Sequence, residues 1–321
     1  MMLTYAQLKS RPRVLRSLTG LTLDAFKTLA QRFVPQWKAC EQRRLTRKNR
    51  VNALGGGHPY RLDDPDKLLL FLVIARHGLT YELAGFLFGL DTSNARRLFL
   101  RVAPAVEAAA DPQLLDFLKH AQARRQRLGG TVGDWQELLK VCPELEELAV
   151  DSTEQPCRRP GRKPARRRYY SGKKKRHTLK TQVVVASGGR VVHVSAAYPG
   201  SRSDGSIYAQ EKTGELIPPR TKQFVDLGYQ GVQKEHPDSD IRLPHKRRSP
   251  GCTGKGQKGP PLTRGQKQAN TLRSKRRVVV ENRLASIKGF RLLSETWRSR
   301  PPQHNPVFRA VAAVSNFRLA A

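Results

Sequence analysis

Two long stretches of this chain contain no carboxylate side chain, and they limit what it can fold into. They are residues 155–203 and 241–280, and both are rich in lysine and arginine. The whole chain carries a formal net charge of +34 over 321 residues. Charge of this size repels itself in a compact fold, so it indicates a polyanionic partner. Nucleic acid is the leading candidate, and an anionic membrane surface is the minor one.

The charge is unevenly distributed along the chain. Residues 1–150 carry 23 basic and 15 acidic side chains, a net of +8. Residues 151–321 carry 37 basic and 11 acidic side chains, a net of +26. We therefore expect the second half, which starts near Asp151, to face the polyanion.

Other features argue against a membrane protein and a secreted one. The longest apolar run, residues 68–75, is far too short to span a bilayer. Residues 1–14 contain no apolar signal core. The four cysteines are scattered and fit neither a disulfide framework nor a zinc spacing. We expect a cytoplasmic protein without a membrane partner.

The first part of the chain, residues 1–110, is predicted to be helical. Apolar residues at three- and four-residue steps predict one helix over residues 13–38. The glycine-rich residues 55–59 predict a break, and residues 63–103 then predict three further helices.

The ends of these three helices are marked by capping residues. The first starts at Pro65 and closes at the sequence Arg-His-Gly. The second is short and ends at Gly89. The third is capped by Thr92 or Ser93 and runs to about Val102.

A short helix, a glycine turn and a capped helix are typical of a helix-turn-helix. The predicted recognition helix presents side chains suited to phosphates and base edges near its start, namely Ser93, Asn94, Arg96 and Arg97. The alternative is an ordinary three-helix packing unit. The charge of the whole chain favours the DNA-binding interpretation.

From residue 144 the pattern changes to β-rich runs bounded by glycine, proline or serine. These runs are residues 145–151, 178–187, 190–200 and 222–231. Helical candidates follow at residues 203–214 and 263–290; the second begins with a Thr-x-x-Gln capping box and stops at Gly289. The pattern predicts a mixed α/β domain over residues 144–321, joined to the helical region by a linking or helical segment at 111–143.

Three acids stand out because the basic surroundings contain so few. Asp151 and Asp226 each follow a predicted strand, and Glu281 lies on the last predicted helix. Acids at the ends of neighbouring strands project into one crevice of an α/β sheet. Three carboxylates converging there suit Mg²⁺, which prefers oxygen ligands. Two such ions, about 3.5–4 Å apart, assist phosphodiester displacement.

Each acid also has an ordinary structural interpretation. Asp151 fits a turn cap with Thr153, and Asp226 fits an Asx-turn before a glycine. Glu281 fits a helical salt bridge with Arg277, four residues earlier. A fourth acid, Asp204, fits a helix N-cap better than a metal ligand.

Two basic segments are expected to clamp the DNA backbone without sequence preference. They are the loop 158–176 and the run 246–277. Their candidate DNA-binding side chains are Arg166, Arg167, Arg168, Lys173, Lys174, Lys175, Lys246, Arg247 and Arg248.

Taken in order, these motifs resemble the DDE transposases of bacterial insertion sequences, in the insertion-sequence-five branch related to Harbinger-type elements. The resemblance covers most of the chain. It rests on the sequences "LTGLTLDAF", "VDSTEQP", "YYSGKKKRHTLKTQVVV", "HVSAAYPGSRSD", "VDLGYQG", "LTRGQKQAN" and "RVVVENRLASIK", together with the helical segment 63–103.

The resemblance implies a helix-turn-helix region followed by a ribonuclease-H-like catalytic domain. It matches Asp151, Asp226 and Glu281 to the catalytic, metal-binding acids. Arg277 and Lys288 match the Arg and Lys of the family's Tyr-x2-Arg-x3-Glu-x6-Lys signature. The Tyr position is occupied here by Ser274, a departure that puts one DNA contact in doubt, and the acid of "SRSD", Asp204, matches a supporting residue.

By the same resemblance, the protein is expected to cut DNA at the ends of its own element and to join those ends to a target. Two Mg²⁺ ions are implied, with Mn²⁺ as a substitute. The implied partner is double-stranded DNA, both terminal inverted repeats and target, bound by a homodimer at the nucleoid of a prokaryotic cell. Two alternatives stay open: a non-catalytic DNA-binding protein, such as a repressor or an inactivated transposase, and a ribonuclease-H-like nuclease without strand transfer.

Overall fold

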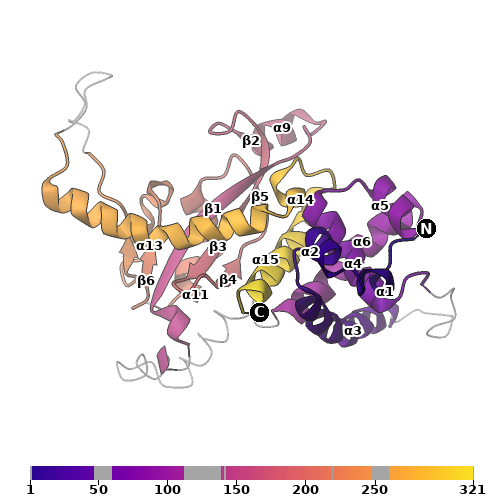
Figure 1. Ribbon diagram of the computed structural model, residues 1–321. Coiled ribbons are helices and arrows are strands. Elements are labelled where there is room, and N and C mark those ends of the chain that lie inside the picture. Colours follow the sequence, from indigo (N-terminus) through magenta and orange to yellow (C-terminus); the bar gives the residue numbers. More distant parts are fainter. Residues whose placement is uncertain are drawn as a thin grey trace. The chain divides into compact units, whose positions relative to one another are not determined.

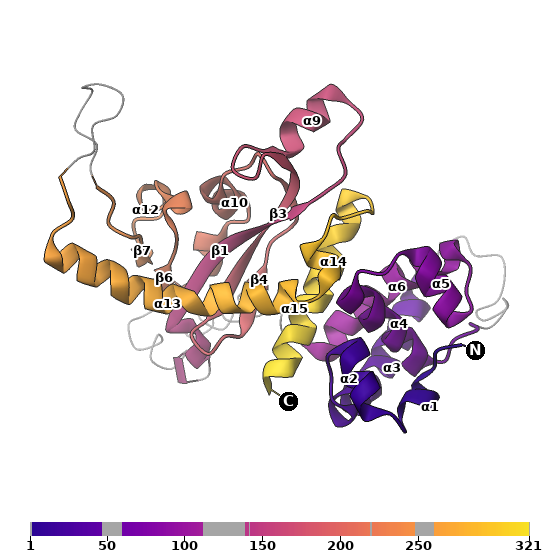
Figure 2. The same cartoon turned by 45° about the horizontal axis from the view of Figure 1, so that its top comes forward.

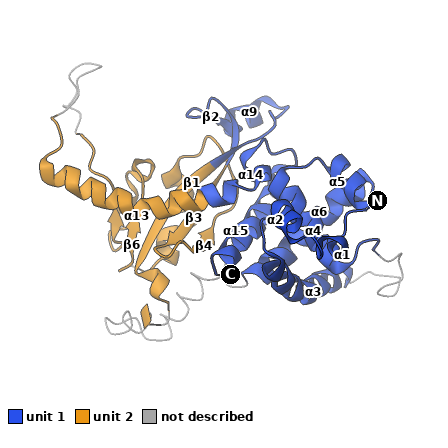
Figure 3. Cartoon of the chain, in the orientation of Figure 1, with its two compact units in different colours: residues 1–115, 154–179, 285–321 blue, residues 116–153, 180–284 orange. Residues whose placement is uncertain are grey.

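The computed structural model describes residues 2–46, 60–111, 139–140, 142–218, 220–247 and 260–320. The expected break at 55–59, most of the expected linker 111–143 and Arg248 lie outside these residues. The chain forms two compact units (Figure 3). Unit 1 comprises residues 1–115, 154–179 and 285–321, and unit 2 comprises residues 116–153 and 180–284. The domain boundaries expected from the sequence divide the chain differently and stay a prediction.

Grouping the chain by unit also regroups its charge. Unit 1 carries 35 basic and 11 acidic side chains, a net of +24, whereas unit 2 carries 25 and 15, a net of +10. Much of the positive charge of the second half therefore belongs to the unit that contains the N-terminal helices.

The N-terminal part of unit 1 is helical, as expected (Figure 1). Its helices are α1 (Tyr5–Leu8), α2 (Pro12–Thr19), α3 (Leu23–Leu45), α4 (Asp64–His77), α5 (Tyr81–Phe88) and α6 (Thr92–Ala110). Helix α4 contains the longest apolar run, and its residues 66–75 are all buried. A helix that is apolar on every side is a core helix, and among the described residues no helix is long and apolar enough to cross a membrane.

Three expectations for these helices were wrong. The single helix expected over residues 13–38 is two helices, because Gly20 takes a left-handed conformation (φ 76°) and Thr22 caps α3. The cap of α6 is Asp91, whose carboxylate accepts the Asn94 N–H at 2.8 Å. Helix α6 also continues to Ala110 rather than ending near residue 102, with its apolar face buried. The expected ends of α4 and α5 are confirmed, each at a left-handed glycine.

Two later segments, residues 154–179 and 285–321, complete the described part of unit 1. They supply α9 (Lys163–Tyr169), β2 (Tyr170–Ser171), α14 (Arg291–Ser294), the 3-10 turn η3 (Pro301–Gln303) and α15 (His304–Ala320). Helix α15 packs along α6, and most of its residues are buried. Helices α14 and α15 follow the helix near residues 263–290, which was the last one predicted from the sequence.

The β-sheet is mixed, in the order β2-β3-β1-β6-β7, with β4 and β5 also paired to β3. Its other strands are β1 (Glu147–Pro156), β3 (Arg176–Ala186), β4 (Val191–Val194), β5 (Tyr198–Pro199), β6 (Lys222–Phe224) and β7 (Ile241–Arg242). Strand β1 runs parallel to β6, and β6 runs parallel to β7. Strands β3 and β4 are antiparallel. This mixed α+β fold is consistent with a ribonuclease-H-like domain.

Short helices and one long helix accompany the sheet in unit 2. They are α10 (Asp204–Gln210), α11 (Thr213–Leu216), α12 (Val232–Glu235) and α13 (Arg264–Lys288), with the 3-10 turns η1 (Pro143–Leu145) and η2 (Leu227–Tyr229). Helix α13 lies along the sheet in both views (Figures 1 and 2). The Thr263–Gln266 capping box is confirmed, with both reciprocal hydrogen bonds formed.

The core of unit 2 lies between the sheet and the short helices. It contains Leu148 and Val150 of β1, Val184 of β3, Tyr208 of α10 and Tyr229 of η2, all fully buried. Because the residues next to Asp151 and Asp226 are anchored in this core, the backbone at both acids is held in place.

Candidate active site

Asp151 lies within β1, not at its end. The strand continues to Pro156 because β3 stays beside it: the Ser187 N–H donates to the Glu147 carbonyl near one end, and the Cys157 N–H donates to the His177 carbonyl near the other. The expected strand end was therefore wrong.

Asp226 lies just after β6 and beside Asp151. Strands β1 and β6 pair in register up to Ala149 and Phe224, and each acid is two residues further on. Asp226 caps the 3-10 turn η2 by accepting the Leu227 N–H at 2.6 Å. This bond is to the next residue, whereas an Asx-turn uses the N–H two residues on, so the expected Asx-turn stays a prediction. The cap nevertheless holds the carboxylate at the end of the short strand.

Arg277 of α13 lies among the three candidate acids. Its guanidinium nitrogens are 3.8 Å from an Asp151 oxygen, 3.7 Å from an Asp226 oxygen and 3.7 Å from a Glu281 oxygen. The Arg277 side chain is 14% exposed, against 57% for that of Glu281. These separations are too long for good hydrogen bonds, so the attraction is mainly between charges. The expected ion pair between Arg277 and Glu281 is confirmed, and it is one of three ion pairs that Arg277 makes with the candidate acids.

The three carboxylates differ in their surroundings. Burial raises the pKa of the Asp151 carboxyl, against the Ser152 N–H and Arg277, which both lower it; Asp226 and Asp204 raise it further. Asp151 accepts the Ser152 N–H at 2.7 Å. Asp226 and Glu281 are much more exposed than Asp151.

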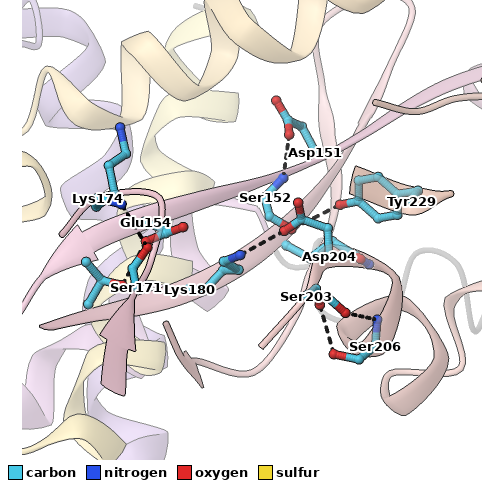
Figure 4. Close-up of polar contacts among 12 residues, drawn as sticks. Asp151, Ser152, Glu154, Ser171, Lys174, Lys180, Ser203, Asp204, Ser206 and Tyr229 are labelled. Atoms are coloured by element: carbon cyan, nitrogen blue, oxygen red, sulfur yellow. Dashed lines mark hydrogen bonds and ion pairs between the residues drawn. The ribbon is translucent and has the colours of Figure 1, made fainter. Parts of the chain in front are cut away.

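Asp204 supports the turn that carries Asp226. It is the first residue of α10, and the helix cap is Ser203, whose hydroxyl accepts the Ser206 N–H, so the expected capping role for Asp204 was wrong. Its carboxylate instead pairs with Lys180 of β3 at 3.2 Å (Figure 4). The same carboxylate lies so close to Gly228 of η2 that a Cβ there would overlap it.

Sequence reasoning missed three side chains of this support. Lys180 is buried in β3, and the Ser152 hydroxyl contacts the hydroxyl of buried Tyr229 at 3.0 Å (Figure 4). Burial raises the pKa of the Tyr229 hydroxyl, which keeps it protonated. The sequence signal that could have revealed this support is Lys180 itself, which stands inside the β-rich run 178–187. A buried lysine requires a counter-ion, so a nearby carboxylate was to be expected.

A large basic groove adjoins the acids. It has a volume of about 1050 Å³ and is lined by Leu227, the residue after Asp226, and by five basic side chains: Lys234, Arg242, Lys246, Arg247 and Arg273. The loop before α13 is fixed by Asn270, whose side chain bonds both backbone groups of His245, at 2.7 and 2.9 Å. Two of the expected DNA-binding residues therefore line one groove.

The other expected DNA-binding residues are spread over unit 1. Ser93, Asn94 and Arg97 are exposed at the start of α6, whereas Arg96 is half-buried and bonds Gln303 at 3.0 Å. Arg167, Arg168 and Lys173 to Lys175 are exposed. The Arg166 side chain donates to the carbonyls of Pro160 and Gly161, so it stabilises the loop to which it belongs.

Comparison with known proteins identifies the family. Residues 150–316, just over half of the chain, match the family described as DDE superfamily endonuclease. The chain is also 31% identical over 258 residues to the "Probable transposase for insertion sequence element IS702" of Microchaete diplosiphon, across 79% of this chain and 80% of the relative. The chain belongs to the DDE superfamily of endonucleases. No solved structure matches it.

This DDE endonuclease is therefore a DNA-cleaving enzyme of the transposase type, as the sequence predicted. DDE enzymes generally use divalent metal ions. Among the described residues, no three His, Cys, Asp or Glu side chains are close enough together to hold a metal ion. Three carboxylates do surround one positive charge, that of Arg277, which is the donor chemistry that a divalent cation requires.

Proposed function

We propose that this DDE endonuclease is the transposase of an insertion sequence of the insertion-sequence-five branch, and that it cleaves the ends of its element and joins them to target DNA. The observation that carries the proposal is the position of the Arg277 guanidinium, within 3.8 Å of Asp151, Asp226 and Glu281. Acids from a strand, a turn and a helix share this one cation. The Arg277-x3-Glu281-x6-Lys288 spacing supports the branch.

In this proposal Asp151, Asp226 and Glu281 hold Mg²⁺, two ions in the working site, with Mn²⁺ as a substitute. The chemistry that such ions would supply is activation of the attacking oxygen and stabilisation of the leaving oxygen of a phosphodiester. Arg277 balances the negative charge of the acids and, with Lys288, contacts phosphate. The ion pair between Asp204 and Lys180, 3.2 Å long, keeps the turn that carries Asp226 in place.

DNA binding is assigned to separate surfaces. We propose that α5 and α6 form a helix-turn-helix whose Ser93, Asn94 and Arg97 read the terminal inverted repeats. The basic loop 158–176 and the groove beside Leu227 then hold the DNA backbone through its phosphates. Two ends must be joined, so the working complex is a homodimer, and its substrate places it at the nucleoid of a prokaryotic cytoplasm.

The test is an oligonucleotide cleavage and strand-transfer assay with Mg²⁺ or Mn²⁺. Asp226→Asn and Glu281→Gln should each abolish both reactions while DNA binding is kept. Matched controls in unit 2 are Asp238→Asn and Glu215→Gln, which alter exposed acids elsewhere. If the first two variants cleave at the wild-type rate, the assignment of the acids is wrong.

The same assay separates the alternatives. A wild-type protein that binds element ends but cleaves none with either metal is a DNA-binding protein, or an inactivated transposase. A protein that cleaves but never joins the ends to a second duplex is a nuclease without strand transfer.

A further inference from the structure

A second basic cavity lies in unit 1 and has no part in the proposed chemistry. It has a volume of about 400 Å³. It is lined by the start of α5, the start of α6, the residue after Cys157 and the loop before η3, through Leu79, Thr80, Tyr81, Glu82, Thr92, Arg96, Arg158, Leu292, Trp297, Arg298, Ser299 and Arg300. All of these residues belong to unit 1.

Four arginines line this cavity, against a single carboxylate, that of Glu82. Two of the arginines are anchored. Arg96 donates to the Gln303 side chain at 3.0 Å, and Arg298 donates to the Gly78 carbonyl at 2.8 Å. Arg158 and Arg300 are exposed, and their guanidinium groups make no hydrogen bond or ion pair with any residue that the structure describes.

The positions of Arg158 and Arg300 are fixed by hydrogen bonds around Trp297. Trp297 is 1% exposed, and its indole N–H donates to the Arg300 carbonyl at 3.2 Å. The Trp297 backbone N–H donates to the Pro156 carbonyl at 2.7 Å, next to the bridge between Trp297 and Cys157. These bonds bring Arg158 and Arg300 to the same cavity although they are far apart in sequence.

Arg298 is also paired with Glu295 at 3.3 Å, which leaves the positive charges of Arg96, Arg158 and Arg300 to repel one another unless an anion lies between them. The planar arginine fork binds the oxygens of a phosphate through two parallel hydrogen bonds. The Tyr81 and Ser299 hydroxyls, 3.0 Å apart at the cavity wall, are further polar groups for such an anion. Phosphate is therefore the chemistry that fits.

The source of the phosphate follows from what surrounds the cavity. Thr92 and Arg96 of its lining belong to the first turns of α6, the helix that we assign to DNA reading. The unit carries a net charge of +24, and Arg158 and Arg300 are exposed to solvent, where a long polyanion can reach them. We propose that this cavity binds a backbone phosphate of the DNA duplex that α6 contacts, with Arg158 and Arg300 as the phosphate-binding residues and Arg96 and Arg298 as their inner support. The proposal rests on the proposed DNA-binding function of α6.

The test measures binding of the full-length protein to a fluorescent duplex that carries an element end, by anisotropy over a range of salt concentrations. The double variant Arg158→Ala, Arg300→Ala should bind roughly tenfold or more weakly, and its slope of log K against log salt should fall by about 1 for each lost phosphate contact. The matched control, Arg11→Ala with Arg13→Ala, removes two exposed arginines of the same unit outside the cavity. Equal slopes and affinities for the two double variants would overturn the proposal.

Two further variants keep the result interpretable. Arg158→Lys with Arg300→Lys retains the charge but loses the fork, so the salt slope should stay near the wild-type value while affinity falls to an intermediate level. Melting curves of every variant check that the fold is kept. If the lysine variant binds like the alanine variant in both slope and affinity, the loss is structural and the proposal fails.

A second arm distinguishes the source of the phosphate. Inorganic phosphate, added without DNA, should raise the melting temperature of the wild-type protein no more than that of the alanine double variant. Stabilisation of the wild-type protein alone would show a site for a free anion and would overturn the DNA assignment.

The result is also separable from the proposed catalysis. The same pocket substitutions in an Asp226→Asn background should weaken DNA binding by the same factor. If the cavity substitutions weaken DNA binding but the wild-type protein does not cleave DNA, the transposase assignment alone is wrong. If the wild-type protein cleaves DNA but the cavity substitutions leave binding unchanged, the cavity proposal alone is wrong.

Discussion

At the scale of single residues, the site is organised by an arginine rather than by its acids alone. Arg277 is the group that Asp151, Asp226 and Glu281 have in common. Asp226 raises the pKa of the Asp151 carboxyl by repulsion between the two negative charges, whereas Arg277 lowers it. We therefore expect the guanidinium to offset the repulsion among the acids before any metal binds.

Removing this arginine should change the metal-free protein most. Arg277→Ala should lower the stability of protein kept in EDTA by about 1–2 kcal/mol, a value reduced for the exposure of Glu281. Mg²⁺ or Mn²⁺ should then stabilise the variant more than the wild type, because the cation replaces the missing charge. Melting curves with and without metal measure both effects.

The neighbouring Arg276 provides the control. It is 61% exposed and pairs with Glu147 at 3.2 Å, away from the acids. Arg276→Ala should respond to metal like the wild type. An equal metal response in the two alanine variants would show that Arg277 does not hold the acids together.

Gly228 is a second residue whose effect can be predicted. A Cβ at this position would overlap the Asp204 carboxylate, so Gly228→Ala must move either Asp204 or the turn that holds Asp226. A displacement of about 1 Å at a catalytic group costs on the order of 100-fold in rate. We expect cleavage to fall about 10- to 100-fold with little change in melting temperature.

Gly188→Ala is the matched substitution, because a Cβ at Gly188 meets nothing within 4 Å. It should leave the cleavage rate at the wild-type value. A wild-type rate for Gly228→Ala as well would remove the positioning role of Asp204.

At the scale of helices and strands, local signals predicted the ends that they mark. Gly78 and Gly89 end α4 and α5, and the Thr263 capping box starts α13, as the sequence indicates. Errors arose where two local signals compete. Asp91 is the cap of α6 instead of Thr92, and Ser203 is the cap of α10 instead of Asp204, because a carboxylate or hydroxyl one residue earlier reaches the free N–H groups.

Long-range pairing could not be predicted from any single segment. Strand β1 continues beyond Asp151 because β3 pairs along its whole length, and that partner lies more than twenty residues away. The candidate acids themselves could be singled out, since carboxylates are rare there and two of them, Asp151 and Asp226, come directly after short apolar runs of the sequence. The support from Lys180 and Tyr229 could not, because it depends on how β3, α10 and η2 pack.

The start of α15 carries a pH-sensitive contact. Gln155 donates its amide to the Leu292 and Glu295 carbonyls, so its oxygen faces His304 Nε2 at 2.7 Å. The His304 proton therefore lies on Nε2, and Nδ1 is buried without a hydrogen-bond partner among the described residues. Burial lowers the pKa of His304 to about 4.

This contact should weaken in acid. His304 stays neutral in the fold, whereas in the unfolded chain it binds a proton near pH 6.5. Its contribution is present above pH 6.5, declines as pH falls and is fully lost below about pH 4, in all about 3 kcal/mol. His304→Gln should flatten the fall in melting temperature between pH 6.5 and 4, whereas His245→Gln, at an exposed site, should keep it. If the melting temperature of His304→Gln falls with pH as steeply as that of the wild-type protein, this account is contradicted.

At the scale of the whole molecule, the two units are interleaved along the chain. Unit 1 needs its last segment, because α15 packs along α6 and buries Val307, Phe308 and Val311. The N-terminal helices therefore do not have a complete core of their own.

A fragment of residues 1–110 tests this interleaving. Although it matches the helical region expected from the sequence, it should be unstable, with its α6 face exposed to solvent. Limited proteolysis should degrade the fragment at a protease concentration that leaves the same helices intact in the full chain. Equal resistance of fragment and full chain would show that these helices fold independently.

The interleaving also bears on how such a gene can evolve. The chain passes between the two units four times, after residues 115, 153, 179 and 284. A single recombination event between two related genes would therefore divide at least one unit. The core of that unit in the hybrid protein would then consist of residues from two different parents, which have not evolved to pack against each other. We expect the DNA preference of this lineage to diversify by point substitutions on the surface of unit 1, with the genes inherited as whole blocks.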